Sequence, residues 1–336
     1  MTRRPDVAFR LIPLAILVMA GGTAAWAGPA WSTRHAAVPW LVALALVGLP
    51  HGAADLAVLA RLRGPRAARR LFAAATLLSC AVLLALVLAP RMALAAFVAV
   101  SVWHFGVAHA RGQSPPPAAA GGALAVAAVA RGAGVLGMPL AVWPAETAAV
   151  ADRVVALAAG PGPPVAQALV HTWGLAILAV AVAALAREAW AARRSPAGRG
   201  RTAATGVDLL ASGLLSIAAH PLFSVGVYFL CWHAWREMRP LLRVLAPRSL
   251  TPDGRPVGLT SLIRGIAAVH RAALPLLIPT WAAVAAVWWF KSPGHAIDDL
   301  ALVSLAAYVV VTPAHEALLD LIGLDRPHPH GLEPSR

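Results

Sequence analysis

The stretch Gly48-Leu49-Pro50-His51-Gly52-Ala53-Ala54-Asp55 places an imidazole and a carboxylate four residues apart within a long apolar segment. An apolar segment of this length is a candidate membrane span. Polar groups inside the hydrocarbon of a bilayer cost a few kcal/mol each, so they usually face the interior of a helix bundle and mark a functional site. His51 and Asp55 are therefore the first candidate site residues.

Three later stretches repeat the pattern of a histidine within an apolar segment. They are Trp103-His104-Phe105-Gly106, Trp232-His233-Ala234-Trp235-Arg236-Glu237 and Pro313-Ala314-His315-Glu316. Imidazole is a good ligand for iron, zinc and copper. Histidines that several membrane helices bring to one depth therefore indicate a bound metal.

The composition identifies a polytopic membrane protein. Of the 336 residues, 60% are hydrophobic and only 12% are charged, and the mean hydropathy is +0.72. We predict an all-α transmembrane bundle of about 7–9 spans. The net charge of +14 comes mainly from short arginine runs between apolar segments, which is typical of loops at a membrane surface and argues against nucleic-acid binding.

The apolar segments predict three regions along the chain. These are an N-terminal extension at 1–35, an integral-membrane catalytic bundle at 36–322 and a disordered tail at 323–336. Ala25-Trp26-Ala27 resembles a cleavage site, so residues 1–27 are either a removable signal peptide or an uncleaved first helix. We expect spans at residues 9–27, 36–60, 71–89, 92–110, 165–186, 207–235, 270–290 and 300–322. The sequence leaves open whether residues 118–142 span, and 143–164 have the composition of a polar connection with a short surface helix.

The arginine-rich loops give a conflicting topology. The loops at 61–70 and 236–264 and the C-terminus are predicted to be cytoplasmic. The loop at 187–206 is equally basic, yet the 29 residues at 207–235 are too short for two spans at a rise of 1.5 Å per residue. We therefore expect one of these loops to face the other side, or a segment to be re-entrant.

Four residues are candidate metal ligands. His233 and Glu237 are four residues apart, so they share one helix face and could bind one ion together. His51 and His104 would reach it from two other helices. Asp55 is placed to accept a hydrogen bond that fixes the tautomer of a ligating imidazole. A single membrane histidine is often only a packing residue. Four histidines at a similar distance from basic segment ends, however, favour a metal site: His51, His104, His233 and His315.

Further residues are predicted around this site or along a substrate channel. Trp103 and Trp232 adjoin ligand histidines, His315 belongs to the fourth stretch, and His220 precedes a proline at a predicted kink. The sequence contains no P-loop motif and no serine-hydrolase motif. The cysteines Cys80 and Cys231 both lie in apolar runs and suggest no disulfide.

These stretches resemble the Brp/Blh family of bacterial and archaeal β-carotene 15,15'-dioxygenases over about residues 40–322. The likeness rests on Gly48-Leu49-Pro50-His51-Gly52-Ala53-Ala54-Asp55, His104-Phe105-Gly106, Tyr228-Phe229-Leu230-Cys231-Trp232-His233 and Thr312-Pro313-Ala314-His315 followed by Asp320. The Gly-Leu-Pro-His-Gly and His-Phe-Gly motifs, in this order, are specific together.

The resemblance implies an Fe(2+) enzyme of the bacterial inner membrane that uses dioxygen to split the central double bond of β-carotene, or a similar carotenoid, into retinal. By position, the family's iron-binding histidines fall on His51, His104 and His233. The family's usual fourth histidine is matched here by Glu237. This departure leaves open which carotenoid is the substrate. The implied partners are the carotenoid, dioxygen, the lipid bilayer and a retinal-binding rhodopsin that accepts the product.

Two other classes of function compete with this interpretation. A non-catalytic membrane transporter or opsin-biosynthesis accessory protein would use the histidines for packing or proton relay. Bound iron after purification would distinguish the enzyme from this alternative. A di-iron lipid hydroxylase would need clustered HxxxH and HxxHH boxes, which the sequence lacks.

Overall fold

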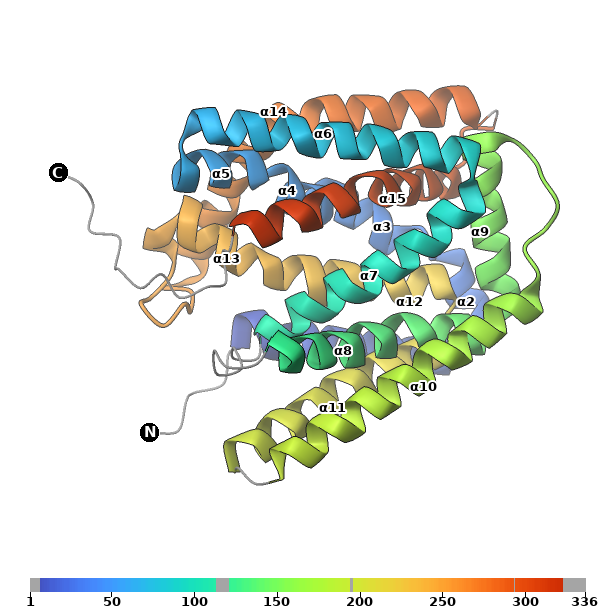
Figure 1. The fold of residues 1–336 in the computed structure, drawn as a ribbon, viewed down its shortest axis with the longest axis horizontal. Coiled ribbons are helices and arrows are strands. Elements are labelled where there is room, and N and C mark those ends of the chain that lie inside the picture. The colour runs from blue at the N-terminus through green and yellow to red at the C-terminus, as the bar shows by residue number, and fades with distance from the viewer. Residues whose placement is uncertain (1–6, 113–120, 194–195, 293, 323–336) are drawn as a thin grey trace.

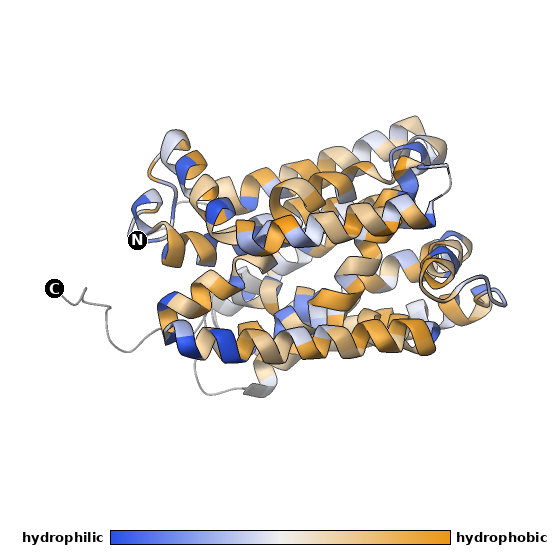
Figure 2. Ribbon diagram, turned by 90° about the horizontal axis from the view of Figure 1, so that it is seen from above, coloured by the Kyte–Doolittle hydropathy of each residue, from blue (hydrophilic) through white to orange (hydrophobic). Residues whose placement is uncertain are grey.

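The computed structural model describes residues 7–112, 121–193, 196–292 and 294–322, and this part of the chain is almost entirely helical and contains no strand. Eight of the described helical segments are long and apolar enough to cross a membrane. In Figure 2 the ribbons are mostly hydrophobic along their lengths, with hydrophilic residues concentrated toward the helix ends. The predicted all-α polytopic bundle is confirmed. The predicted tail at 323–336 lies outside the described residues.

The helices run mostly along one common direction, as Figure 1 shows. The first half of the chain forms η1 (Val7–Leu11), α1 (Ile12–Ala27), α2 (Pro29–Arg34), α3 (Val38–Val42), η2 (Ala43–Val47), α4 (Gly48–Ala53), α5 (Asp55–Arg63), α6 (Pro65–Leu88) and α7 (Pro90–Gly112). The second half forms α8 (Gly121–Val142), α9 (Pro144–Ala159), α10 (Gln167–Ala192), α11 (Pro196–Ala218), α12 (Pro221–Val227), η3 (Tyr228–Ala234), α13 (Trp235–Leu245), η4 (Pro247–Ser249), α14 (Leu259–Lys291) and α15 (Ile297–Ile322). Segments η1, η2 and η3 are π-helical, and η4 is a 3-10 turn.

Glycine followed by proline separates successive helices at two places. Gly28 and Gly64 both have φ of +82°, a left-handed conformation that glycine adopts without steric cost. Pro29 and Pro65 then occupy the first turn of the next helix, where the missing N–H has no partner to lose. The local sequence thus ends α1 and α5 and starts α2 and α6.

The predicted single span at 207–235 is wrong, because the chain reverses at His220. Helix α11 ends at Ala218, Pro221 starts α12, and the α12–η3–α13 pass returns in the opposite direction (Figure 1). Both passes carry charged residues in their outer halves, which lowers their hydropathy and hid the reversal. Of residues 118–142, which the sequence left open, the described residues 121–142 form the apolar helix α8, and 143–164 contain α9 across one end of the bundle.

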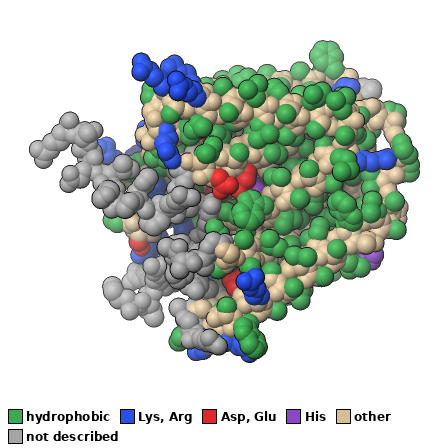
Figure 3. All heavy atoms as spheres, viewed as in Figure 1, with side chains coloured by type: hydrophobic (Ala, Val, Ile, Leu, Met, Phe, Trp, Pro, Cys, Tyr) green, Lys and Arg blue, Asp and Glu red, His purple; other side chains and the backbone are tan. Residues whose placement is uncertain are grey.

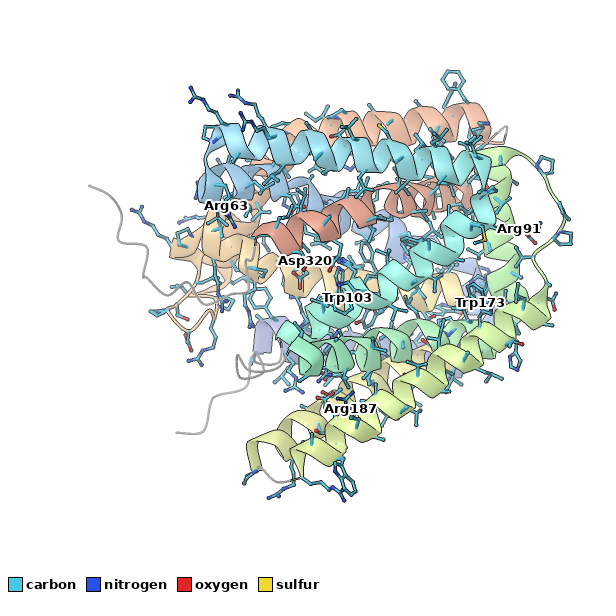
Figure 4. All side chains as sticks on the ribbon, viewed as in Figure 1. Arg63, Arg91, Trp103, Trp173, Arg187 and Asp320 are labelled. Atoms are coloured by element: carbon cyan, nitrogen blue, oxygen red, sulfur yellow. The ribbon has the colours of Figure 1, made fainter. Side chains whose placement is uncertain are left out.

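The reversal removes the conflict between the basic loops. Arg61 donates to the carbonyl of Val244 at 2.8 Å, and Arg63 donates to that of Leu321 at 3.0 Å, so the ends of α5, α13 and α15 meet. Figure 4 shows Arg63 and Arg91 at opposite ends of the bundle, with α10 running from the Arg91 end toward Arg187. The described residues of the basic segments, at 61–70, 187–193, 196–206 and 236–264, therefore lie toward the same end.

The outer face of the bundle is apolar. In Figure 3 hydrophobic side chains cover most of the visible face, while Lys and Arg gather mainly where α5 meets α6. Helix α6 exposes Leu77, Leu84 and Leu88 at 71%, 57% and 73%. Leucines this exposed along one helix fit a surface that faces lipid.

Candidate metal centre

His51 lies on α4, directly after the π-helical turn η2. Its Nδ1 contacts the carbonyl oxygen of Val47 at 3.1 Å, so an Nδ1–H donor would leave Nε2 free to bind a metal. A Cβ on the preceding Gly48 would lie 2.5 Å from the Tyr308 hydroxyl oxygen and 2.8 Å from the Phe229 ring. Glycine at this position allows α4 to pack this closely against α15 and η3.

His104 lies on α7, which touches α8 through Gly106. A Cβ on Gly106 would lie 1.9 Å from the carbonyl oxygen of Ala128. The backbones of α7 and α8 are thus in direct contact two residues beyond His104. This close approach explains why the third position of the His-Phe-Gly motif is glycine, since any side chain there would collide with α8.

His233 lies on the π-helical segment η3, and π-helical turns are frequent at functional sites. Its ring packs against Phe105, with ring centroids 4.7 Å apart, and against Phe229 at 5.8 Å. The imidazole thus packs against one ring from α7 and one from η3 itself.

His51, His104 and His233 converge on one point. Each offers a ligand nitrogen, and these nitrogens all lie within 4.8 Å of one another. The Nε2 atoms of His104 and His233 are 2.9 Å apart. Two imidazole nitrogens bound at about 2.1 Å and at right angles are about 3.0 Å apart, so this pair fits a shared metal ion. The three side chains come from different helices and are 5%, 3% and 3% exposed.

Two buried carboxylates hold histidines of this region. Glu316 Oε2 lies 2.5 Å from Nδ1 of His104, and Asp55 Oδ2 lies 2.6 Å from Nδ1 of His315. A carboxylate that accepts from Nδ1–H leaves the Nε2 lone pair free for a metal. The predicted acceptor Asp55 thus pairs with His315 rather than His51. Sequence reasoning gave Glu316 no role, although it follows His315 directly in the fourth stretch.

A cavity of about 330 Å³ adjoins the histidine group. His51, His104 and His315 line one part of it, and mainly apolar side chains of α6, α7, α14 and α15 line the rest. The lining hydroxyls of Thr76 and Thr280 donate to the carbonyls of Phe72 and Leu276 in their own helices, at 2.9 and 2.7 Å. These hydroxyls are therefore satisfied, and they add little polarity to the cavity wall.

Glu237 lies outside the group of converging ligands. It is half-buried and lines a separate small cavity together with His233, Trp232 and Arg236. The ring of Trp232 packs edge-on against His109 at 5.4 Å, and the Arg236 guanidinium lies over it at 4.6 Å. Trp232 therefore belongs to the packing behind His233.

Two other predicted residues lie away from the converging nitrogens. Trp103 is half-buried on α7 (Figure 4) and does not line the 330 Å³ cavity. His220 caps α12, because its Nδ1 accepts a hydrogen bond from the backbone N–H of Leu222 at 3.3 Å. Neither residue contributes to the histidine group.

Comparison with known proteins adds one match. The family model described as beta-carotene 15,15'-dioxygenase matches residues 42–322, which is most of the chain. No curated protein and no solved structure matches the chain. The matched range includes every histidine that converges on the centre.

Proposed function

Because the chain belongs to the β-carotene 15,15'-dioxygenase family, we propose that it is an iron-dependent oxygenase that cleaves β-carotene, or a related carotenoid, to retinal. The cleaved bond is the central 15,15' double bond. The observation that carries the proposal is the group formed by His51, His104 and His233 beside an apolar cavity. Both atoms of dioxygen enter the two aldehyde groups, so the reaction balances without an external reductant.

The side chains of the centre suit a ferrous ion. Imidazole nitrogens bind iron well, and sites with open positions allow dioxygen to react. Iron, when bound, would supply the activation of dioxygen. The protein's part is to orient the imidazoles. The Glu316 carboxylate holds Nδ1 of His104, and the backbone carbonyl of Val47 holds Nδ1 of His51. Burial of the three rings also keeps bulk water from the reacting atoms.

The cavity suits a hydrocarbon substrate that dissolves in the bilayer. Helix α6 contributes Phe72 and Thr76 to the cavity wall, while it exposes Leu77 and Leu84 on its outer side. A polyene could pass from lipid to the histidines along this helix without crossing water. We therefore propose entry of the carotenoid from within the membrane.

We propose a location in the bacterial inner membrane with the basic loops on the cytoplasmic side. The described residues of the basic segments, at 61–70, 187–193, 196–206 and 236–264, share one end of the bundle, and this supports the orientation by the positive-inside rule. Transfer of retinal to a rhodopsin has no support in the comparisons and stays a prediction.

Product analysis tests the proposed function. The protein is produced in a bacterium that accumulates β-carotene, and extracts are analysed for retinal and for other apocarotenals. Retinal should form with the wild-type chain and disappear with His51→Ala, His104→Ala and His233→Ala at equal protein levels. A transporter or accessory protein would leave β-carotene intact in every strain, and that result would refute the proposal.

A further inference from the structure

A fourth imidazole lies at the histidine group. The ring centroid of His315 is 5.0 Å from that of His51 and 5.2 Å from that of His104. Within the group itself, the corresponding distances from His233 are 5.6 Å to His51 and 4.5 Å to His104. The ring of His315 therefore lies about as close to the rings of His51 and His104 as the ring of His233 does.

The hydrogen bonds of His315 leave one nitrogen for a metal. Its Nδ1 contacts Asp55 Oδ2 at 2.6 Å, while its Nε2 is buried and has no hydrogen-bond partner in the described part of the chain. The Nε2 of His51 is in the same state. A buried unpaired imidazole nitrogen is costly, and a metal ion would satisfy it.

We propose that His315, through Nε2, is the fourth ligand of the metal held by His51, His104 and His233. This inference rests on the proposed metal site. It assigns the fourth position to a residue near the end of the bundle's last helix. Glu237, which occupies the position of the family's usual fourth histidine, lines the separate small cavity instead.

The charges of the surroundings agree with this ligand set. Four neutral imidazoles leave the two positive charges of a ferrous ion uncompensated. The buried carboxylates Asp55 and Glu316, 2% and 8% exposed, each hold one of the proposed ligands and together supply two negative charges. A carboxylate ligand at Glu237 would add a third negative charge, which a buried site would have to compensate elsewhere.

Metal binding by His315→Ala and its matched control Glu237→Ala tests the assignment. Each full-length protein is purified in detergent and loaded with Co(II), and its affinity is measured by competition with a chelator. We expect His315→Ala to bind at least tenfold more weakly and Glu237→Ala to bind within twofold of the wild type. Added imidazole should restore binding to His315→Ala, because it can occupy the vacated ligand position, and a purely structural role would give no such rescue.

X-ray absorption of the iron-loaded wild-type protein provides a readout without substitution, and we expect four imidazole ligands. Wild-type affinity in His315→Ala, a loss of affinity in Glu237→Ala, or a spectrum with three imidazoles and a carboxylate would overturn the inference. These experiments distinguish a failure of the ligand assignment from a failure of the proposed function. A protein with four imidazole ligands that forms no retinal refutes only the function, and one that forms retinal with Glu237 bound refutes only the ligand assignment.

Discussion

Replacing Gly106 with alanine would force α7 and α8 apart next to the proposed metal centre. The added Cβ would lie 1.9 Å from the Ala128 carbonyl oxygen, whereas real Cβ atoms essentially never come closer than 3.0 Å. The two backbones must therefore separate by at least about 1.1 Å, since helix backbones in a packed interior cannot yield locally. Metal–ligand distances tolerate only about 0.2 Å, and His104 lies two residues before the substitution.

We expect Gly106→Ala to lower metal affinity by about tenfold or more, and a ligand misplaced by about 1 Å to reduce retinal formation by about 10²-fold. Chelator competition and product analysis at equal protein levels measure the two effects. Gly22→Ala in α1 is the matched control, because no atom lies within 4 Å of its added Cβ. Wild-type metal affinity in Gly106→Ala would refute the argument that this contact positions His104.

Three further predictions concern the carboxylate, the cavity and the membrane orientation. Glu316→Gln removes the charge beside Nδ1 of His104 and should weaken metal binding by about 10–100-fold in chelator competition; unchanged binding would contradict its role. Thr76→Trp should block the cavity and abolish retinal formation while metal content stays normal, whereas Leu77→Trp on the lipid side should leave both intact. Cysteines placed at Arg66 and Arg248 should both react only from the cytoplasmic side, and labelling of either from the periplasm would reverse the orientation.

Local sequence patterns predicted the fold class and the residues that meet at the centre. Apolar length identified most of the spans, and the similar distances of His51, His104 and His233 from basic segment ends indicated a common depth. The structure brings these three side chains together. Depth along a helix can be predicted in this way because each residue adds a fixed rise.

The reversal at His220 could not be predicted from hydropathy. The two passes that meet there place arginines in their outer halves, so only their inner halves form a continuous apolar run. A window that measures apolarity reports this run as one span. The sequence Ala219-His220-Pro221 predicted a kink, since proline removes a backbone hydrogen bond and kinks or breaks a helix, but a kink and a reversal share this signal.

The carboxylate partners depend on contacts between distant parts of the chain. Asp55 and His315 are 260 residues apart, and His104 and Glu316 are 212 apart. Sequence spacing indicates which residues share one helix face, as it did for His233 and Glu237, but not which helices become neighbours. The local pair was therefore favoured as a chelate, whereas the structure pairs the histidines with carboxylates from other helices.

The arrangement of the histidines favours a metal site over a proton relay. A relay needs imidazoles in a file whose rings can exchange tautomers as protons pass. Here the Nδ1 atoms of His51, His104 and His315 are each held by a hydrogen-bond acceptor, which fixes one tautomer. Their Nε2 atoms lie on the opposite side of each ring, where they can bind an ion. The rings form a cluster rather than a line. Fixed tautomers around one point would hinder proton transfer, but they are the condition for binding an ion through several nitrogens at once.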